Sequence, residues 1–134
     1  MASWDDVHEL ALAMPGAHED SRGGAWKADG GKGARSFAWD RPLRARDIQE
    51  HGVEEGPIFG VRVADEGEKA ALIASDPDVF FTIPHFDGYN AVLVRLDRIS
   101  RDRLLEVMTD SWLVVAPKKA AAAYLAASNP VPFA

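Results

Sequence analysis

Residues 80–96 read FFTIPHFDGYNAVLVRL, and this stretch decides the fold. Two runs rich in β-branched and aromatic residues flank an irregular insert, a pattern typical of two strands joined by a loop. We predict strands over residues 79–83 and 91–96. The insert, residues 84–90, is longer than the tight turn that joins a simple hairpin. It is therefore either a packed turn that buries its own rings or the rim of a site.

Three further strands are predicted on the N-terminal side of this pair. They cover residues 25–28, 35–39 and 58–63, where short runs carry apolar or alternating residues. The glycines within residues 29–33 permit positive φ angles and suit a hairpin turn between the first two strands. Because strands that follow one another through short turns pair in opposite directions, we expect an antiparallel sheet.

The remaining segments show helical patterns. Helices are predicted over residues 3–14, 42–51, 66–74, 100–115 and 118–127. Ser3, Asp65 and Ser100 stand where an N-cap residue is expected. The order of strands and helices predicts an α+β fold of two layers, in which helices pack on one face of an antiparallel sheet.

The length and the periodicities also predict the domain and its core. A chain of 134 residues fits one domain, which we place at residues 1–127, with residues 128–134 as a frayed tail. The side chains expected to be mostly buried are Val7, Leu10, Ile58, Val61, Val79, Phe81, Val92, Val94, Leu105, Met108 and Trp112.

The composition excludes several classes of protein. The chain has no cysteine, which excludes disulfides and thiolate metal sites and fits a reducing cytoplasm. No apolar run approaches the roughly 20 residues that span a membrane. The opening MASWDDVHEL is acidic where a signal peptide would be basic. We therefore expect a cytoplasmic protein with no membrane partner and no cofactor.

Charge is distributed unevenly along the chain. The net charge is −6, yet residues 22–46 carry +5, so the rest carries −11. Such a block is either a solvated face or a surface for a polyanion. The second reading predicts a basic wing that contacts DNA, made of Lys32, Arg35, Trp39, Arg41, Arg44 and Arg46.

Three segments resemble the MmcQ/YjbR family. They are TIPHFDGY at residues 82–89, followed by VLVRL at 92–96; SWLVVAPK at 111–118; and ALAMPG at 11–16, with Glu19 after it. The similarity covers about residues 4–127. It implies a compact α+β fold with an antiparallel sheet and helices on one side, related to small secretion-chaperone-like and frataxin-like folds. Members are commonly labelled DNA-binding, and the resemblance implies no catalytic residues.

The insert allows a second hypothesis, a binding cleft for a protein or a small anionic ligand. Its residues would be His85, Asp87, Tyr89, Trp112, Lys118 and Lys119. Lysines at the start of a helix face its positive dipole end, and an anionic partner would relieve that misfit. In the structural reading, by contrast, Phe86 or Tyr89 packs against Trp112 or Pro117, and His85 bonds a carbonyl freed by the proline. Both readings place the His85 loop beside residues 116–118.

Metal and catalytic chemistry are less well supported by the sequence. His85 and Asp87 supply two possible ligands, but a metal site needs three or four. The same two residues are candidates for acid–base catalysis, yet no nucleophile motif or paired carboxylates accompany them. The sequence thus predicts no metal site and no catalytic residue. Its leading interpretation is a DNA-binding module, and the alternative is the protein- or ligand-binding cleft.

Overall fold

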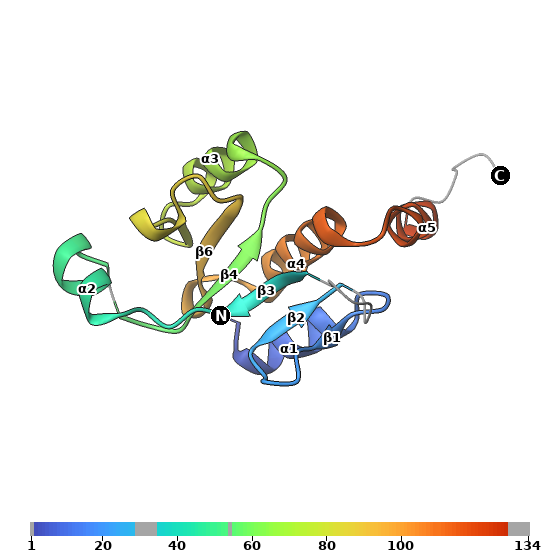
Figure 1. Cartoon of the computed structure of the whole chain (residues 1–134), viewed down its shortest axis with the longest axis horizontal. Helices are drawn as coiled ribbons and strands as arrows, with labels where there is room; N and C mark the ends of the chain where they lie inside the picture. Colours follow the sequence, from blue (N-terminus) through green and yellow to red (C-terminus); the bar gives the residue numbers. More distant parts are fainter. Residues whose placement is uncertain (1, 29–34, 54, 129–134) are drawn as a thin grey trace.

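The computed structural model describes residues 2–28, 35–53 and 55–128. Within these ranges the chain forms one sheet of six strands, all paired antiparallel, in the order β1-β2-β3-β4-β6-β5 (Figure 1). The strands are β1 (His18–Glu19), β2 (Ala25–Lys27), β3 (Ser36–Asp40), β4 (Ile58–Arg62), β5 (Phe80–Phe81) and β6 (Ala91–Arg95). The predicted α+β class is confirmed.

Five α-helices and two short 3-10 helices accompany the described sheet. They are α1 (Trp4–Leu12), α2 (Ala45–His51), α3 (Glu66–Ser75), α4 (Arg101–Val115), α5 (Lys118–Ser128), η1 (Pro84–Phe86) and η2 (Leu96–Arg98). The three predicted N-caps are confirmed. The side chains of Ser3, Asp65 and Ser100 accept hydrogen bonds from the backbone N–H groups three residues further on, which satisfies donors that a helix start otherwise leaves unpaired.

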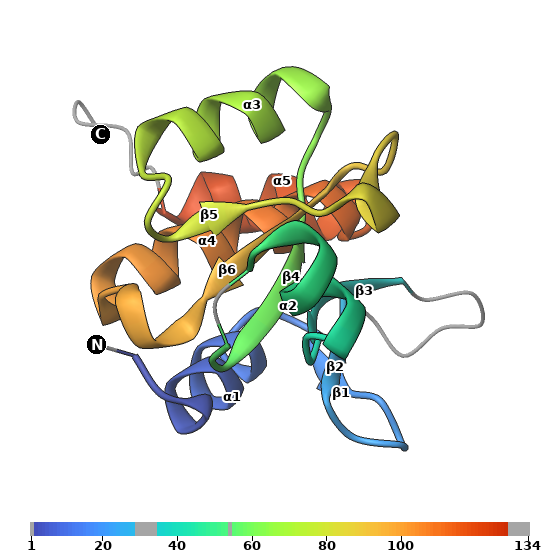
Figure 2. The same cartoon turned by 90° about the vertical axis from the view of Figure 1, so that its left-hand side faces the viewer.

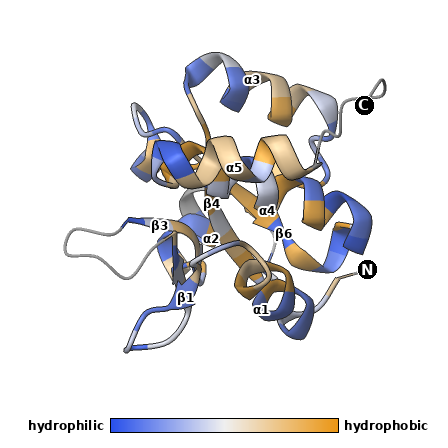
Figure 3. Cartoon of the chain, turned by 90° about the vertical axis from the view of Figure 1, so that its right-hand side faces the viewer, coloured by the Kyte–Doolittle hydropathy of each residue, from blue (hydrophilic) through white to orange (hydrophobic). Residues whose placement is uncertain are grey.

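The main core lies between the sheet and the helices α1 and α4. In β4 and β6, Phe59, Val61, Val92 and Val94 point to this side and pack with Trp112 of α4. The hydrophilic residues of α1 turn away from this core (Figure 3). Because side chains alternate along a strand, the neighbouring residues must face the other way.

A smaller apolar cluster covers the opposite face of the sheet. It contains Ile58, Ile83, Phe86, Ala91 and Leu93. In Figure 2, α2 and the segment after β5 lie in front of the sheet, whereas α4 and α5 lie behind it. The sheet thus has a helical face and a second face covered by loops and α2.

The structure corrects several details of the sequence prediction. β1 lies in residues 17–24, which show only a polar, glycine-rich pattern, and it pairs with β2. Leu105 was expected in the core but is 42% exposed, whereas its neighbour Leu104 is fully buried. The buried positions of α4 are 104, 107, 108, 111 and 112, and at about 100° per residue Leu105 falls outside that stripe. Phe81 is only partly buried.

Two predictions fall outside the described residues. The proposed turn at residues 29–33 and most of the 128–134 tail lie there. Of the helices in the described part of the chain, none combines the length and apolar character needed to cross a membrane.

Candidate functional site

The second face of the sheet carries a concave site that we call the arginine–aromatic pocket. Its volume is about 280 Å³. It is lined by Trp39, Arg41, Arg62, His85, Phe86, Tyr89 and Ala91. Arg41 directly follows β3, and the other residues come from β3, β4, β6 and the 84–89 loop, so the sheet forms the floor and the loop forms the rim.

The floor of the pocket depends on a glycine beneath a tryptophan. Trp39 and Gly60 are paired neighbours on β3 and β4. A Cβ atom at Gly60 would lie 2.5 Å from the Trp39 indole, so only glycine lets this ring lie against the strand. The Arg62 guanidinium lies 5.6 Å from the Trp39 ring centroid, within the range of a cation–π contact.

Arg62 is held by hydrogen bonds of both its side chain and its backbone carbonyl. Its Nε donates to the Ser36 carbonyl at 2.9 Å, and its own carbonyl accepts from the buried Ser111 hydroxyl of α4 at 2.8 Å. Partial burial lowers the pKa of the Arg62 guanidinium, and the charge of Arg35 lowers that pKa further. The positive charge of Arg35 thus acts on an arginine that lines the pocket.

The rim is a short loop built around a buried ring. Phe86 is 9% exposed, and His85 and Tyr89 each meet it edge-to-face. The His85 and Tyr89 rings are nearly parallel, with an interplanar angle of 12°. Gly88 of the same loop has a φ of +80°, a backbone conformation that glycine adopts more readily than other residues.

A buried lysine holds this loop on the protein. Lys69 of α3 is 3% exposed. Its Nζ donates to the carbonyls of Phe86 at 2.8 Å and Tyr89 at 3.1 Å. An ammonium group removed from water needs such partners. The position of His85 and Tyr89 is thus set by a residue 16 to 20 positions earlier in the chain.

A second hollow adjoins the pocket and shares Arg41 and His85 with it. Its volume is about 340 Å³, and its lining is Arg41, Arg44, Arg46, Asp47, Pro84 and His85. The Asp47 carboxylate accepts from the Arg44 backbone N–H at 2.9 Å and lies 3.9 Å from the Arg41 guanidinium. The Arg41 guanidinium also lies 5.5 Å from the Phe86 ring centroid. Three arginines and one acid thus surround this hollow.

The fold brings together residues that the sequence assigned to two different sites. Trp39, Arg41, Arg44 and Arg46, from the predicted basic wing, meet His85 and Tyr89, from the predicted cleft. Arg35 acts on Arg62 through its charge. Asp87 is exposed and lines neither hollow, and Lys32 lies outside the described residues.

The other half of the predicted cleft is corrected. Trp112 is fully buried in the core on the helical face, where it packs against Tyr124 of α5. Lys118 and Lys119 are exposed at the start of α5. Figure 1 places α5 at one end of the molecule and the yellow 84–88 segment at the other. The predicted contact of the His85 loop with residues 116–118 is therefore wrong.

Arg62, Ala91 and Lys69 are site residues that sequence reasoning did not identify. Strand alternation in IFGVRV places Arg62 opposite the buried Val61, so its face was predictable, but its partners were not. Lys69 gave no signal, because a lysine within a helix is usually solvated.

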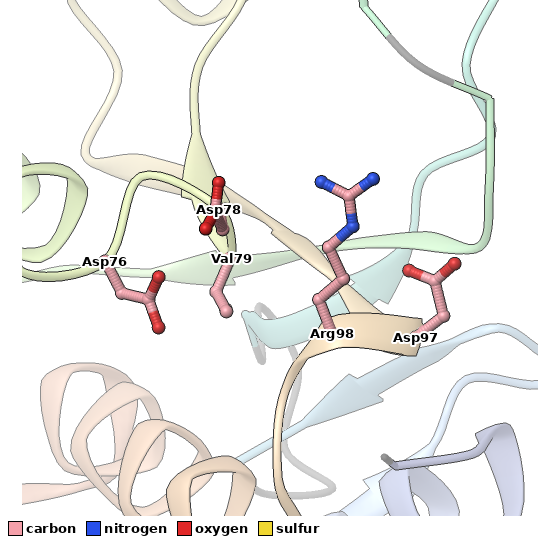
Figure 4. A pocket seen from close by; sticks show the side chains of 5 residues that line it. All are labelled: Asp76, Asp78, Val79, Asp97 and Arg98. Carbon is pink, nitrogen blue, oxygen red and sulfur yellow. The ribbon is translucent and has the colours of Figure 1, made fainter.

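A wider depression lies at the far end of β5 and β6. It measures about 490 Å³ and is lined by Asp76, Asp78, Val79, Asp97 and Arg98. In Figure 4 the Arg98 side chain lies between Asp97 and the other two carboxylates. Within the described ranges, no group of three or more His, Asp or Glu side chains is placed to hold a metal ion.

Comparisons with known proteins agree with this architecture. The family model described as YjbR matches residues 12–114. Uncharacterized proteins of Mycobacterium tuberculosis and Mycobacterium bovis are each 47% identical over 134 residues, covering 96% of this chain and all of each relative. The crystal structure of Deinococcus radiodurans protein DR2400, with a DUF419 domain, superposes with a TM-score of 0.63. That match is 21% identical and covers 89% of this chain and 82% of the other.

Proposed function

The chain belongs to the YjbR family, and on that premise we propose that it is a nucleic-acid-binding module. Its contact surface is the arginine–aromatic pocket together with the adjoining hollow. The arginines contact phosphates and the rings contact bases. This surface replaces the basic wing expected from the sequence, because it includes Arg62, His85 and Tyr89 and lies on one face of the sheet.

The observation that carries the proposal is the convergence of arginines on one face. Arg41, Arg44 and Arg46 line the hollow, and Arg62 lies beside Arg41 in the pocket. Guanidinium groups match phosphate oxygens with paired hydrogen bonds. In the lining of the two hollows, as described, Asp47 is the one acid, and its carboxylate lies 3.9 Å from the Arg41 guanidinium. A lining in which arginines outnumber acids favours an anionic partner.

The acidic remainder of the chain supports binding through this face alone. Residues outside 22–46 carry a net charge of −11. Negative charge elsewhere on the surface repels phosphates and orients an approaching strand toward the arginines. The module therefore binds with one defined side rather than coating its partner.

A second candidate function is favoured by the shape of the pocket. At about 280 Å³ it is concave and close to the lower limit, about 300 Å³, of sites that bind small molecules. A small aromatic anion would use the same arginines and rings. Competition between a free nucleoside monophosphate and an oligonucleotide separates the two functions, because a dedicated small-ligand site would prefer the monophosphate.

The proposal is tested by fluorescence anisotropy with labelled oligonucleotides at several salt concentrations. Wild-type protein should bind at low salt, and log K should fall with log salt by about 0.7 to 0.9 per phosphate contact. Arg44→Gln should weaken binding to all sequences and reduce that slope by about one contact.

The matched control is Arg103→Gln, which removes the same charge from α4, where Arg103 pairs with Glu106. It should leave binding unchanged. No binding to single- or double-stranded DNA or RNA at low salt, or equal loss in both variants, would reject the proposal.

A further inference from the structure

We propose that the arginine–aromatic pocket receives one unpaired nucleobase, so that the protein binds single strands in preference to duplexes. This inference rests on the proposed function and specifies its ligand. The ring of the base contacts the aromatic side chains, and its phosphate lies over the adjoining hollow.

The first argument is the exposure of aromatic surface at the rim. Tyr89 is 62% exposed, and His85 is also exposed. Both rings stand on the buried Phe86, in nearly parallel planes. Aromatic side chains in such positions are the usual stacking platforms for bases of single strands.

The second argument is that the pocket is already formed. Gly60 lets the Trp39 indole lie on the sheet, Arg62 is held by Ser36, and Lys69 fixes the carbonyls of Phe86 and Tyr89. A ligand therefore meets groups whose positions are already set. Such preorganisation reduces the entropy lost on binding.

The third argument is geometric. Bases in a duplex are stacked and present only their edges in the grooves. A base of a nucleic acid can enter a concave pocket of about 280 Å³ that is lined by rings only after it has left the stack. Because Arg41 and His85 line both hollows, a base in the pocket brings its phosphate to the hollow of Arg44 and Arg46.

The test compares three labelled oligonucleotides of equal length by anisotropy at one salt concentration. They are an intact single strand, the same strand with abasic sites, and the blunt duplex. Since stacking one base contributes about 1–3 kcal/mol, which corresponds to about 5- to 150-fold in affinity, the intact strand should bind at least about fivefold more tightly than either competitor. A ribonucleotide strand of the same sequence, measured alongside, shows whether DNA or RNA is preferred.

Two substitutions at one position connect this preference to the pocket. Tyr89→Ala should reduce affinity for the intact strand and leave affinity for the abasic strand unchanged. Tyr89→Phe, which keeps the ring, should behave as wild type. Because Tyr89 is mostly exposed, both variants should fold, which a thermal melt checks.

The outcomes separate this inference from the proposed function. If the intact strand, the abasic strand and the duplex bind equally, base recognition is overturned and phosphate binding remains. Tighter binding of the duplex than of the intact strand leads to the same conclusion. Failure of all three to bind overturns both. If Tyr89→Ala loses the preference for the intact strand over the abasic strand and Tyr89→Phe keeps it, the result supports base binding in the pocket.

Discussion

The Nζ atom of Lys69 lies 2.8 Å from the carbonyl oxygen of Phe86, so a buried lysine of α3 secures the loop that forms the rim of the pocket. Figure 2 shows α3 and this loop on the same side of the molecule. The hydrogen bond between Lys69 and Phe86 therefore contributes both to the stability of the fold and to the position of the pocket rim.

Lys69→Met should therefore lower both stability and binding. The variant keeps an apolar stem but removes the charged donor, so the Phe86 and Tyr89 carbonyls keep only their backbone partners, the N–H groups of Tyr89 and Ala91. Hydrogen bonds to charged groups contribute about 1.5–3 kcal/mol, and urea denaturation should reveal a loss of that order. Lys119→Met, at an exposed position of α5, should change stability by less than about 0.5 kcal/mol. Equal stability of the two variants would contradict the role given to Lys69.

Gly60→Ala should destabilise the sheet through a clash with Trp39. The added methyl group would lie 2.5 Å from the indole, and overpacking of this kind costs about 1–3 kcal/mol. In a double-mutant cycle with Trp39→Leu, the combined loss should be smaller than the sum of the single losses, because the smaller side chain leaves room for the methyl group. Simple additivity would show that the ring and the strand are not in contact.

Trp112→Ala and Leu105→Ala test which face of α4 is buried in the core. Trp112 is fully buried, whereas Leu105 is 42% exposed. Removing the tryptophan should cost about 3–5 kcal/mol, and removing the leucine about 0.5 kcal/mol or less. Thermal or urea unfolding measures both, and similar losses would restore Leu105 to the core.

His85→Ala should leave stability nearly unchanged and weaken ligand binding. The side chain is exposed and lines both hollows, and surface substitutions usually change stability by less than about 0.5 kcal/mol. Unfolding and anisotropy on the same variant decide the matter. A large loss of stability with unchanged binding would assign His85 to packing instead.

Asp110→Asn should stabilise the protein at neutral pH but not in acid. Partial burial, assisted by the charges of Glu68 and Glu106 and opposed by Arg103, raises the pKa of the Asp110 carboxyl from its ordinary value of 3.8. A raised folded-state pKa means that ionisation disfavours the folded state. Asp110 therefore costs no stability below about pH 3.8, where it is protonated in both the folded and the unfolded state. It lowers the stability of the folded protein as pH rises through its raised folded-state pKa.

The thermal midpoint of Asp110→Asn should exceed that of the wild type at pH 7, and the difference should disappear near pH 3. Asp102→Asn serves as the control, since Asp102 stands in the first turn of the same helix. Its carboxylate there interacts favourably with the positive end of the helix dipole. That substitution should not stabilise the protein. A gain for Asp110→Asn that is independent of pH would contradict the assigned cause.

Local sequence determined the secondary structure and the class of fold. Ser3, Asp65 and Ser100 mark helix starts because an N-cap satisfies donors within three residues of itself. The residues around 58–63 and 91–96 formed β4 and β6, because runs of β-branched and apolar residues suit strands that are buried on both faces of a sheet. The two-residue strand β1 escaped detection, because it depends on pairing with β2 rather than on any local pattern, and β5 covers only Phe80–Phe81 of the strand predicted over residues 79–83.

Only the tertiary structure decided where the candidate site lies. The sequence identified Trp39, Arg41, Arg44, Arg46, His85 and Tyr89 but divided them between a wing and a cleft, and it joined His85 to Trp112. The pairing of β4 between β3 and β6 brings Trp39 and Arg62 beside the 84–89 loop, whereas α4 packs on the opposite face of the sheet and places Trp112 in the core there. A residue pattern specifies which face of its own strand or helix is buried. Which faces meet depends on strand order and long-range packing, and these involve residues far apart in the chain.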